Sequence, residues 1–257
     1  MTRGPAGASV AWMRFCSPAG FLALRWCALV IPAAACLAAD APAPDDALIE
    51  MVLEQSSREE VAFRTVVERV TGHRVLPIDP AQAIDRAILE VITRAMNQTL
   101  AELNAADSPV KRERRINEAS RYFEESLERI IDAEPDFECT IPATADGNHL
   151  ASGYPDRRIL HVPSGRVAYL DPKLVEAGSM TSTLRTFYFT PRTTTNKIQD
   201  DAHHLLAGIT HDGKDGAWTF LSWKLVDLHD FHVRLKAEYQ AGNKDLYRDE
   251  LIIRSGP

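Results

Sequence analysis

The chain has 257 residues, of which 45% are hydrophobic and 25% are charged, and its formal net charge is −7. This composition is ordinary for a globular protein, and the length suffices for one large domain or two small ones. The acidic balance excludes a global basic field that would attract a polyanion, so any contact with nucleic acid must come from a local basic surface.

Residues 1–39 are typical of a secretory signal peptide. Arginine is the only charged residue type before Asp40, and the apolar run over residues 26–39 is too short for a comfortable membrane span and is followed by small residues. We therefore expect export to the periplasm or secretion, with no stable membrane partner after cleavage. A membrane anchor or a misassigned start is the alternative.

Cysteine usage agrees with this prediction. Cys16, Cys27 and Cys36 fall in the leader, so only Cys139 remains after cleavage. A single thiol forms no internal disulfide, and the mature fold must therefore rely on its hydrophobic core.

Residues 40–109 are expected to form a helical N-terminal region. Apolar residues recur near helical spacing between Leu48 and Val70, and a second helix is predicted from Pro80, with Asp79 as its N-cap, up to a break at residues 104–109. A third helix is predicted over about 109–133, with one apolar face and other faces rich in Arg and Glu.

The pattern changes to short β-branched and aromatic runs at Pro135. Strands are predicted at about 137–142, 157–162, 166–171, 184–189, 217–226 and 231–239. One helix is predicted between them, at about 198–208 and ending at Gly208. The order predicts an α+β domain over residues 110–257, with helices packed on a mixed sheet.

Two of these strands form a predicted hairpin around Pro163-Ser164-Gly165, which brings Asp156 close to Asp171. A two-residue loop would set Asp156 opposite Lys173, and a four-residue loop would set it opposite Asp171. Both gather the three side chains on one face, whereas a three-residue loop sends Asp156 to the other face. The sequence leaves this register open.

Two carboxylates and a lysine on one face have a chemical use. Close carboxylates raise each other's pKa unless a cation lies between them, and Mg²⁺ suits one or two carboxylates together with phosphate oxygens and waters. The lysine would orient or deprotonate the attacking water, or stabilise developing charge. The alternative is a solvated hairpin end with a weak ion pair.

Pro155-Asp156, a gap of fourteen residues and then Asp171-Pro172-Lys173 resemble the motif of the PD-(D/E)xK nuclease superfamily, which includes many type II restriction endonucleases. The core order of that family, helix, three strands, helix and strand, is similar to residues 110–226, about half of the chain. The resemblance implies a restriction-endonuclease-like fold and Mg²⁺-dependent hydrolysis of DNA. It also implies that Asp156 and Asp171 hold the metal and that Lys173 is the catalytic lysine. Many members add a helix glutamate, for which Glu124 and Glu128 are both candidates.

A polar loop from Thr190 to Lys197 is a second candidate site. Arg185, Arg192 and Lys197 would bind substrate phosphates there through their charge, and the alternative is an ordinary surface loop.

Histidines are concentrated in the second half of the chain. Asp200 and Asp201 would join His204 on one face of the predicted helix, and His203, His211, His229 and His232 also invite a metal site. No HExxH spacing is present, so structural histidines are the favoured interpretation.

Three candidate functions follow. The first is metal-dependent phosphodiester hydrolysis of DNA by an exported restriction-endonuclease-like protein. The second is a non-catalytic exported binding or structural protein on the same fold, and a hydrolase that uses the histidines with another metal is a third. The oligomeric state is left open.

Overall fold

The structure is a computed structural model that describes residues 44–56, 60–150, 152–184, 186–236, 238 and 240–254. The predicted signal peptide and Arg185 lie outside these residues. Within the described ranges, no helix combines the length and the apolar character needed to cross a membrane.

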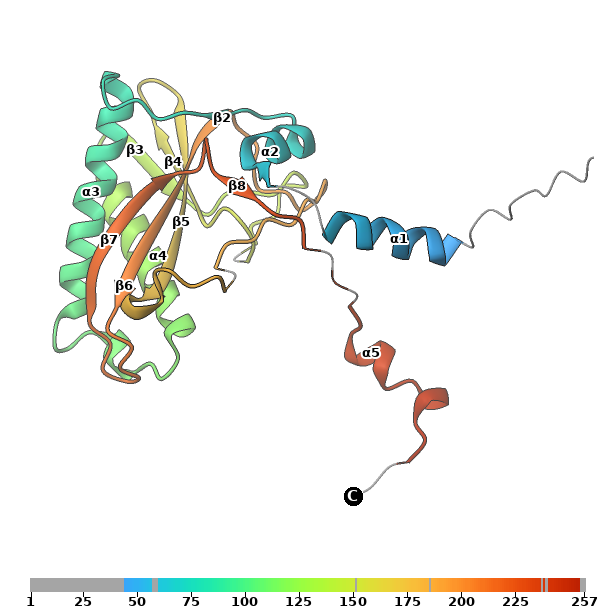
Figure 1. The fold of residues 1–257 in the computed structure, drawn as a ribbon. Helices are drawn as coiled ribbons and strands as arrows, with labels where there is room; N and C mark the ends of the chain where they lie inside the picture. The colour runs from blue at the N-terminus through green and yellow to red at the C-terminus, as the bar shows by residue number, and fades with distance from the viewer. Residues whose placement is uncertain are drawn as a thin grey trace, which may run out of the picture.

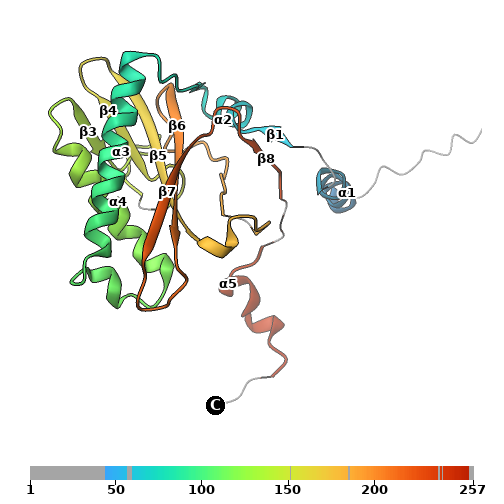
Figure 2. The ribbon, with the colours of Figure 1, turned by 60° about the vertical axis from the view of Figure 1, so that its left-hand side comes forward.

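A six-stranded mixed sheet organises the fold (Figures 1 and 2). Its strands are β2 (Val75–Leu76), β3 (Phe137–Thr140), β4 (Arg157–His161), β5 (Arg166–Glu176), β6 (Ala202–His211) and β7 (Phe220–Asp227). They are ordered β2-β6-β5-β4-β3, and β7 also pairs with β6. The pairs β5–β6 and β2–β6 are parallel, and the other pairs in the sheet are antiparallel.

Two long helices, α3 (Ala83–Asn104) and α4 (Ile116–Asp132), cover one face of the sheet (Figure 2). The 3-10 helix η1 (Pro109–Arg112) lies between them in the chain. The apolar stripe of α4 is buried because its residues recur every three or four positions. The stripe consists of Ala119, Phe123, Leu127, Ile130 and Ile131, and it belongs to the same core as Ile159, Leu170, Leu205 and Ala207 of the sheet.

The opposite face of the sheet carries a second core built around Phe63, Tyr154 and Tyr169. It is covered by α2 (Phe63–Thr71) and by a small sheet in which β1 (Val61–Ala62) pairs with β8 (His232–Val233). The remaining elements are α1 (Pro44–Ser56), η2 (Ala177–Ser179), α5 (Asn243–Leu246) and η3 (Asp249–Leu251). Figure 1 shows α1 and α5 extending away from the sheet.

The helix predicted at residues 198–208 is wrong, because most of this segment belongs to β6. The strand lies between β5 on one side and β2 and β7 on the other, and both of its faces are covered. A strand buried on both faces loses the alternation of apolar and polar residues, so its run of His and Leu imitates a helix. Asp200 and Asp201 therefore share no helix face with His204.

The strand predicted at 184–189 is also wrong for the described residues of that segment, which form neither helix nor strand. Phe187 and Phe189 place their rings 5.3 and 5.8 Å from the ring of Phe63. Their alternating burial therefore reflects packing on the second core and not pairing in a sheet. Of the described residues in the strand predicted at 231–239, only the two of β8 form a strand. Helix α3 begins three residues after Pro80 and has Gln82, not Asp79, at its N-cap.

The predicted fold class is confirmed. The described chain is a mixed α+β protein with a multi-stranded sheet flanked by helices, as expected for a restriction-endonuclease-like fold.

Candidate functional site

The hairpin between β4 and β5 has a four-residue loop, one of the registers that the sequence left open. His161 pairs with Arg166 and Arg157 pairs with Leu170. Gly165 in the loop has a φ of 70°, which glycine adopts without strain. Extending the register by one residue sets Asp156 opposite Asp171, so both carboxylates and Lys173 lie on the same face of the sheet.

The sheet opens at the position of Asp171. Strand β4 begins at Arg157, opposite Leu170, whereas β5 continues to Glu176 with β6 as its partner. Beyond Leu170, β5 is therefore an edge strand on its β4 side, which is where Pro172 is tolerated within a strand. The same opening leaves the Lys173 side chain 27% exposed, although that of Asp171 is only 2% exposed.

The three predicted residues are in direct contact. Nζ of Lys173 lies 2.5 Å from Oδ2 of Asp171 and 3.4 Å from Oδ2 of Asp156. Oδ2 of Asp171 is buried and accepts no hydrogen bond within the described residues, so the ion pair with Lys173 is its main compensation. The structure therefore brings Asp156, Asp171 and Lys173 into one cluster.

This cluster has unusual electrostatics. Burial, together with the neighbouring charge of Asp156, raises the pKa of Asp171 to about 7. Burial alone would lower the pKa of Lys173, but the two carboxylates outweigh it and raise that pKa. The lysine is therefore a stable ammonium, whereas Asp171 changes its charge near neutral pH.

Helix α4 contributes Glu124 to the edge of this cluster. Burial and the charge of Asp156 raise the pKa of Glu124. Arg157 is 5% exposed and binds both helix candidates, with Nη1 3.2 Å from Oε2 of Glu124 and Nε 2.9 Å from Oε2 of Glu128. Glu124 is the less exposed of the two and is the one that responds to Asp156, so it is the stronger candidate.

Replacing Arg157 with Met should lower the free energy of unfolding by about 3 kcal/mol, because Glu124 would keep its burial and lose its cation. Chemical denaturation of the two proteins measures this. Arg74 is a matched control, since its pair with Asp201 is 71% and 39% exposed and its loss should cost less than about 1 kcal/mol. Equal losses for the two variants would contradict this interpretation.

The structure places the residues of the second candidate site in different environments. Arg192 is exposed in the loop after β5, whereas Lys197 is buried and donates to the backbone oxygens of Gly153 and Pro155, 2.8 Å from each. Arg185 lies outside the described residues. Lys197 thus binds the turn that precedes Asp156. The sequence did not indicate this contact, because no local pattern links the two segments.

The histidines do not gather around one centre. His203 bonds Asp85, with Nε2 3.1 Å from Oδ1, and His204 bonds the Tyr154 hydroxyl at 2.8 Å through Nδ1. Burial lowers the pKa of His204 to about 3, so the ring that shares this hydrogen bond with Tyr154 is neutral. In the described part of the chain no three His, Cys, Asp or Glu side chains form a group that could hold a metal ion.

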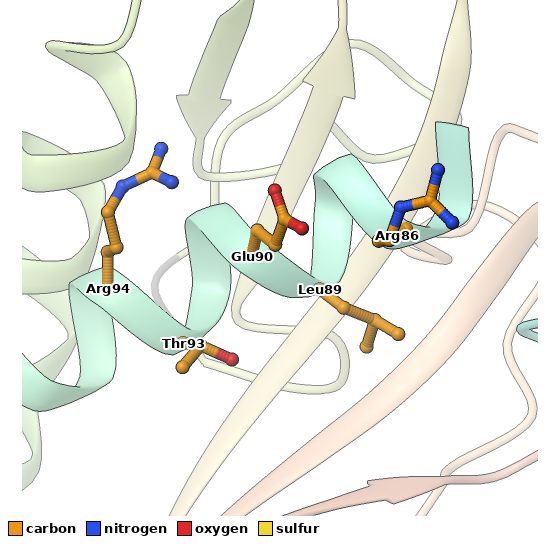
Figure 3. Close-up of a pocket in the computed structure, with 5 residues that line it drawn as sticks. All are labelled: Arg86, Leu89, Glu90, Thr93 and Arg94. Atoms are coloured by element: carbon orange, nitrogen blue, oxygen red, sulfur yellow. The ribbon is translucent and has the colours of Figure 1, made fainter. Parts of the chain in front are cut away.

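A shallow pocket of about 290 Å³ lies on the outer side of α3 (Figure 3). Its lining is Arg86, Leu89, Glu90, Thr93 and Arg94. All five residues come from this one helix, and none belongs to the carboxylate cluster. The pocket is therefore separate from the candidate site.

Comparison with known proteins shows the family of this chain. The family model described as the type II restriction enzyme MjaV family matches residues 53–250. The type II restriction enzyme MjaV of Methanocaldococcus jannaschii is 27% identical over 217 residues, which cover 80% of this chain and 94% of that protein. No solved structure matches the chain. Because the family model spans most of the chain, including α4 and the β4–β5 hairpin, the chain belongs to the type II restriction enzyme MjaV family.

Proposed function

We propose that this protein is a Mg²⁺-dependent DNA endonuclease of the PD-(D/E)xK type, with Asp156, Asp171 and Lys173 as its catalytic centre. The observation that carries the proposal is the register of the β4–β5 hairpin, which sets Asp156 opposite Asp171 and places Lys173 between them. Membership of a restriction enzyme family supports DNA as the substrate.

The residues present fit a hard divalent cation. Oδ2 of Asp171 is buried and is paired with Lys173, but the neighbouring charge of Asp156 still raises the pKa of Asp171. A further cation between the two carboxylates would offset this repulsion. Two carboxylates at the point where β5 becomes an edge strand suit Mg²⁺, which takes its other oxygens from water and phosphates and rarely uses a cage made of protein ligands alone. When bound, the ion would polarise the phosphoryl group and activate water.

Lys173 would be the cation that the protein itself contributes to the site, beside the bound metal ion. Its raised pKa keeps it protonated beside the two carboxylates, so it is poorly suited to remove a proton from water. A fixed ammonium in a half-buried site instead stabilises the negative charge that develops on the phosphate oxygens. We therefore assign Lys173 to charge stabilisation and to orientation of the attacking water.

Arg192 is proposed as a DNA contact because its loop lies close to the turn before Asp156. The backbone N–H of Ala145 donates to Asn196 at 2.8 Å, and Lys197 of the same loop binds Gly153 and Pro155. An exposed arginine there would meet the phosphate backbone near the carboxylate pair. Arg185 stays a prediction of the same kind.

The experiment that tests the proposed function is cleavage of supercoiled plasmid by the purified protein. With Mg²⁺ we expect nicked and linear products, and EDTA should stop the reaction. Cleavage of linear DNA into discrete fragments would indicate sequence-specific activity, as expected for this family, whereas a continuous smear would indicate a non-specific nuclease. Intact plasmid at all divalent cation concentrations would favour the non-catalytic alternative.

The signal peptide over residues 1–39 and the export that it implies stay predictions. They are independent of the site, because that site is built from residues after Ser120. N-terminal sequencing of the protein purified from its own cells would test them, and a mature chain that begins near Asp40 is the expected result.

A further inference from the structure

Lys197 is the most deeply buried cation near the candidate site, with a relative exposure of 2%. It lies in the connection between β5 and β6, next to Ile198, which belongs to the second core. Moving an ammonium out of water costs several kcal/mol unless its N–H groups are bonded. The burial of Lys197 therefore indicates that its charge has a role in the structure.

The bonds of Lys197 connect it to the turn that delivers Asp156. Nζ donates to the carbonyl oxygens of Gly153 and Pro155, each at 2.8 Å. These residues lie on either side of Tyr154, and Asp156 follows directly. The ammonium thus closes the turn immediately before the first carboxylate of the site.

A second anchor holds the same turn from the sheet. The Tyr154 hydroxyl bonds Nδ1 of His204 at 2.8 Å, and His204 is a buried residue of β6. The Tyr154 ring also packs edge-on against Phe63, at 5.6 Å between ring centroids. With its backbone bound by Lys197 and its side chain bound by His204, the turn has little freedom to shift relative to Asp171.

The charge of Lys197 has a further effect. Burial lowers the pKa of Lys197, and the carboxylates of Asp156, Glu124 and Asp171 act against this and favour its charged form. A neutral side chain could bind a carbonyl but could not offset this cluster of negative charge. Because Lys197 is buried and two of its three N–H groups are used by carbonyls, it is not placed to bind a DNA phosphate.

We infer that Lys197 is a positioning residue, whose ammonium holds the Gly153–Pro155 turn and thereby places the Asp156 carboxylate opposite Asp171 for cation binding. The inference rests on the proposed function. Lys197 would then not bind a substrate phosphate, as the sequence suggested, but would act indirectly by helping to form the metal site.

The test is Mn²⁺ binding to the full chain. Binding is measured from the electron paramagnetic resonance signal of the free ion. Lys197→Met should weaken Mn²⁺ binding by about tenfold or more, as is usual when a residue that orients a metal ligand is lost. Lys214→Met is the matched control, since it makes the same substitution and removes one positive charge from a side chain that is 75% exposed. Its Mn²⁺ affinity should equal that of the wild type.

DNA binding without metal separates positioning from phosphate contact. Lys197→Met should keep the wild-type affinity for duplex DNA and the same salt dependence, measured by fluorescence anisotropy. A phosphate contact would instead lower the slope of log affinity against log salt by about one. Unchanged Mn²⁺ binding together with that lower slope would overturn the inference.

Tyr154→Phe keeps the test decisive if Lys197→Met fails to fold. It removes the hydroxyl bond to His204 and keeps the ring packing, so it should fold and bind Mn²⁺ several-fold more weakly. Wild-type affinity in Tyr154→Phe, or in a folded Lys197→Met, would overturn this inference alone. If the wild type itself bound no Mn²⁺ at the carboxylate pair, the proposed function and this inference would fall together.

Discussion

Asp171→Asn is expected to abolish DNA cleavage and to make the protein more stable at pH 8. The Asp171 side chain is 2% exposed, and its pKa is raised to about 7 by burial and by Asp156. Above that pH the folded protein holds a buried carboxylate that the unfolded chain would hydrate freely. Asparagine removes this cost, which is on the order of a few kcal/mol, and it also removes a negative ligand that the proposed metal site requires.

The sign of the pH dependence makes this prediction specific. A carboxyl group whose pKa is raised on folding lowers stability as pH increases from its unfolded value, near 4, to its folded value, near 7. Below this window the protonated Asp171 resembles asparagine, so wild type and variant should unfold at similar temperatures. Thermal unfolding at about pH 3.5 and at pH 8 measures the difference, and a variant that is less stable than wild type at pH 8 would contradict the burial argument.

The second large effect is expected in the pH dependence of Mg²⁺-dependent cleavage. At limiting Mg²⁺, the rate should fall about tenfold for each pH unit below the pKa of Asp171, because the cation binds the carboxylate and must displace its proton. That pKa is about 7. Higher Mg²⁺ should move the midpoint to lower pH, since metal and proton compete for the same oxygens.

Residual metal binding in Asp156→Asn provides the control for this effect. Asp156 is the second cause of the raised pKa of Asp171, after burial. Its removal should lower the pH midpoint of Mn²⁺ binding while weakening the binding itself. A midpoint that stays at the wild-type pH would show that another group controls the titration.

The hairpin and its chemistry were predictable from the sequence because they are local. Pro163 and Gly165 indicate a short turn, and a short turn brings Asp156 near Asp171 in any register. The choice among loop lengths was not predictable, since the sequence offered no independent constraint on register. In the structure, the hairpin has the register that sets the two carboxylates opposite each other.

Other features of the fold and the site could not be predicted, because they depend on contacts between segments that are distant in the sequence. Strand β6 was predicted as a helix because both of its faces are buried, one in the core beneath α3 and α4 and the other in the second core. Those contacts are set by the fold and not by residues 198–208. The bonds from Lys197 to Gly153 and Pro155 span more than forty positions, so the apparent phosphate-binding loop gave no sign of them. Glu124 was identified only as one of two candidates, and its nearness to Asp156 required the packing of α4 on the sheet.

We propose that one metal-dependent cleavage centre is formed by Asp156, Asp171 and Lys173. Its most direct test is the rate at which the wild type and Lys173→Ala nick supercoiled plasmid in Mg²⁺, at equal protein concentration and with folding checked by circular dichroism. We expect Mg²⁺-dependent nicking by the wild type and a loss of about a hundredfold or more in Lys173→Ala, because the only cation that contacts both carboxylates among the described residues is removed. Equal nicking by the two proteins would contradict this proposal.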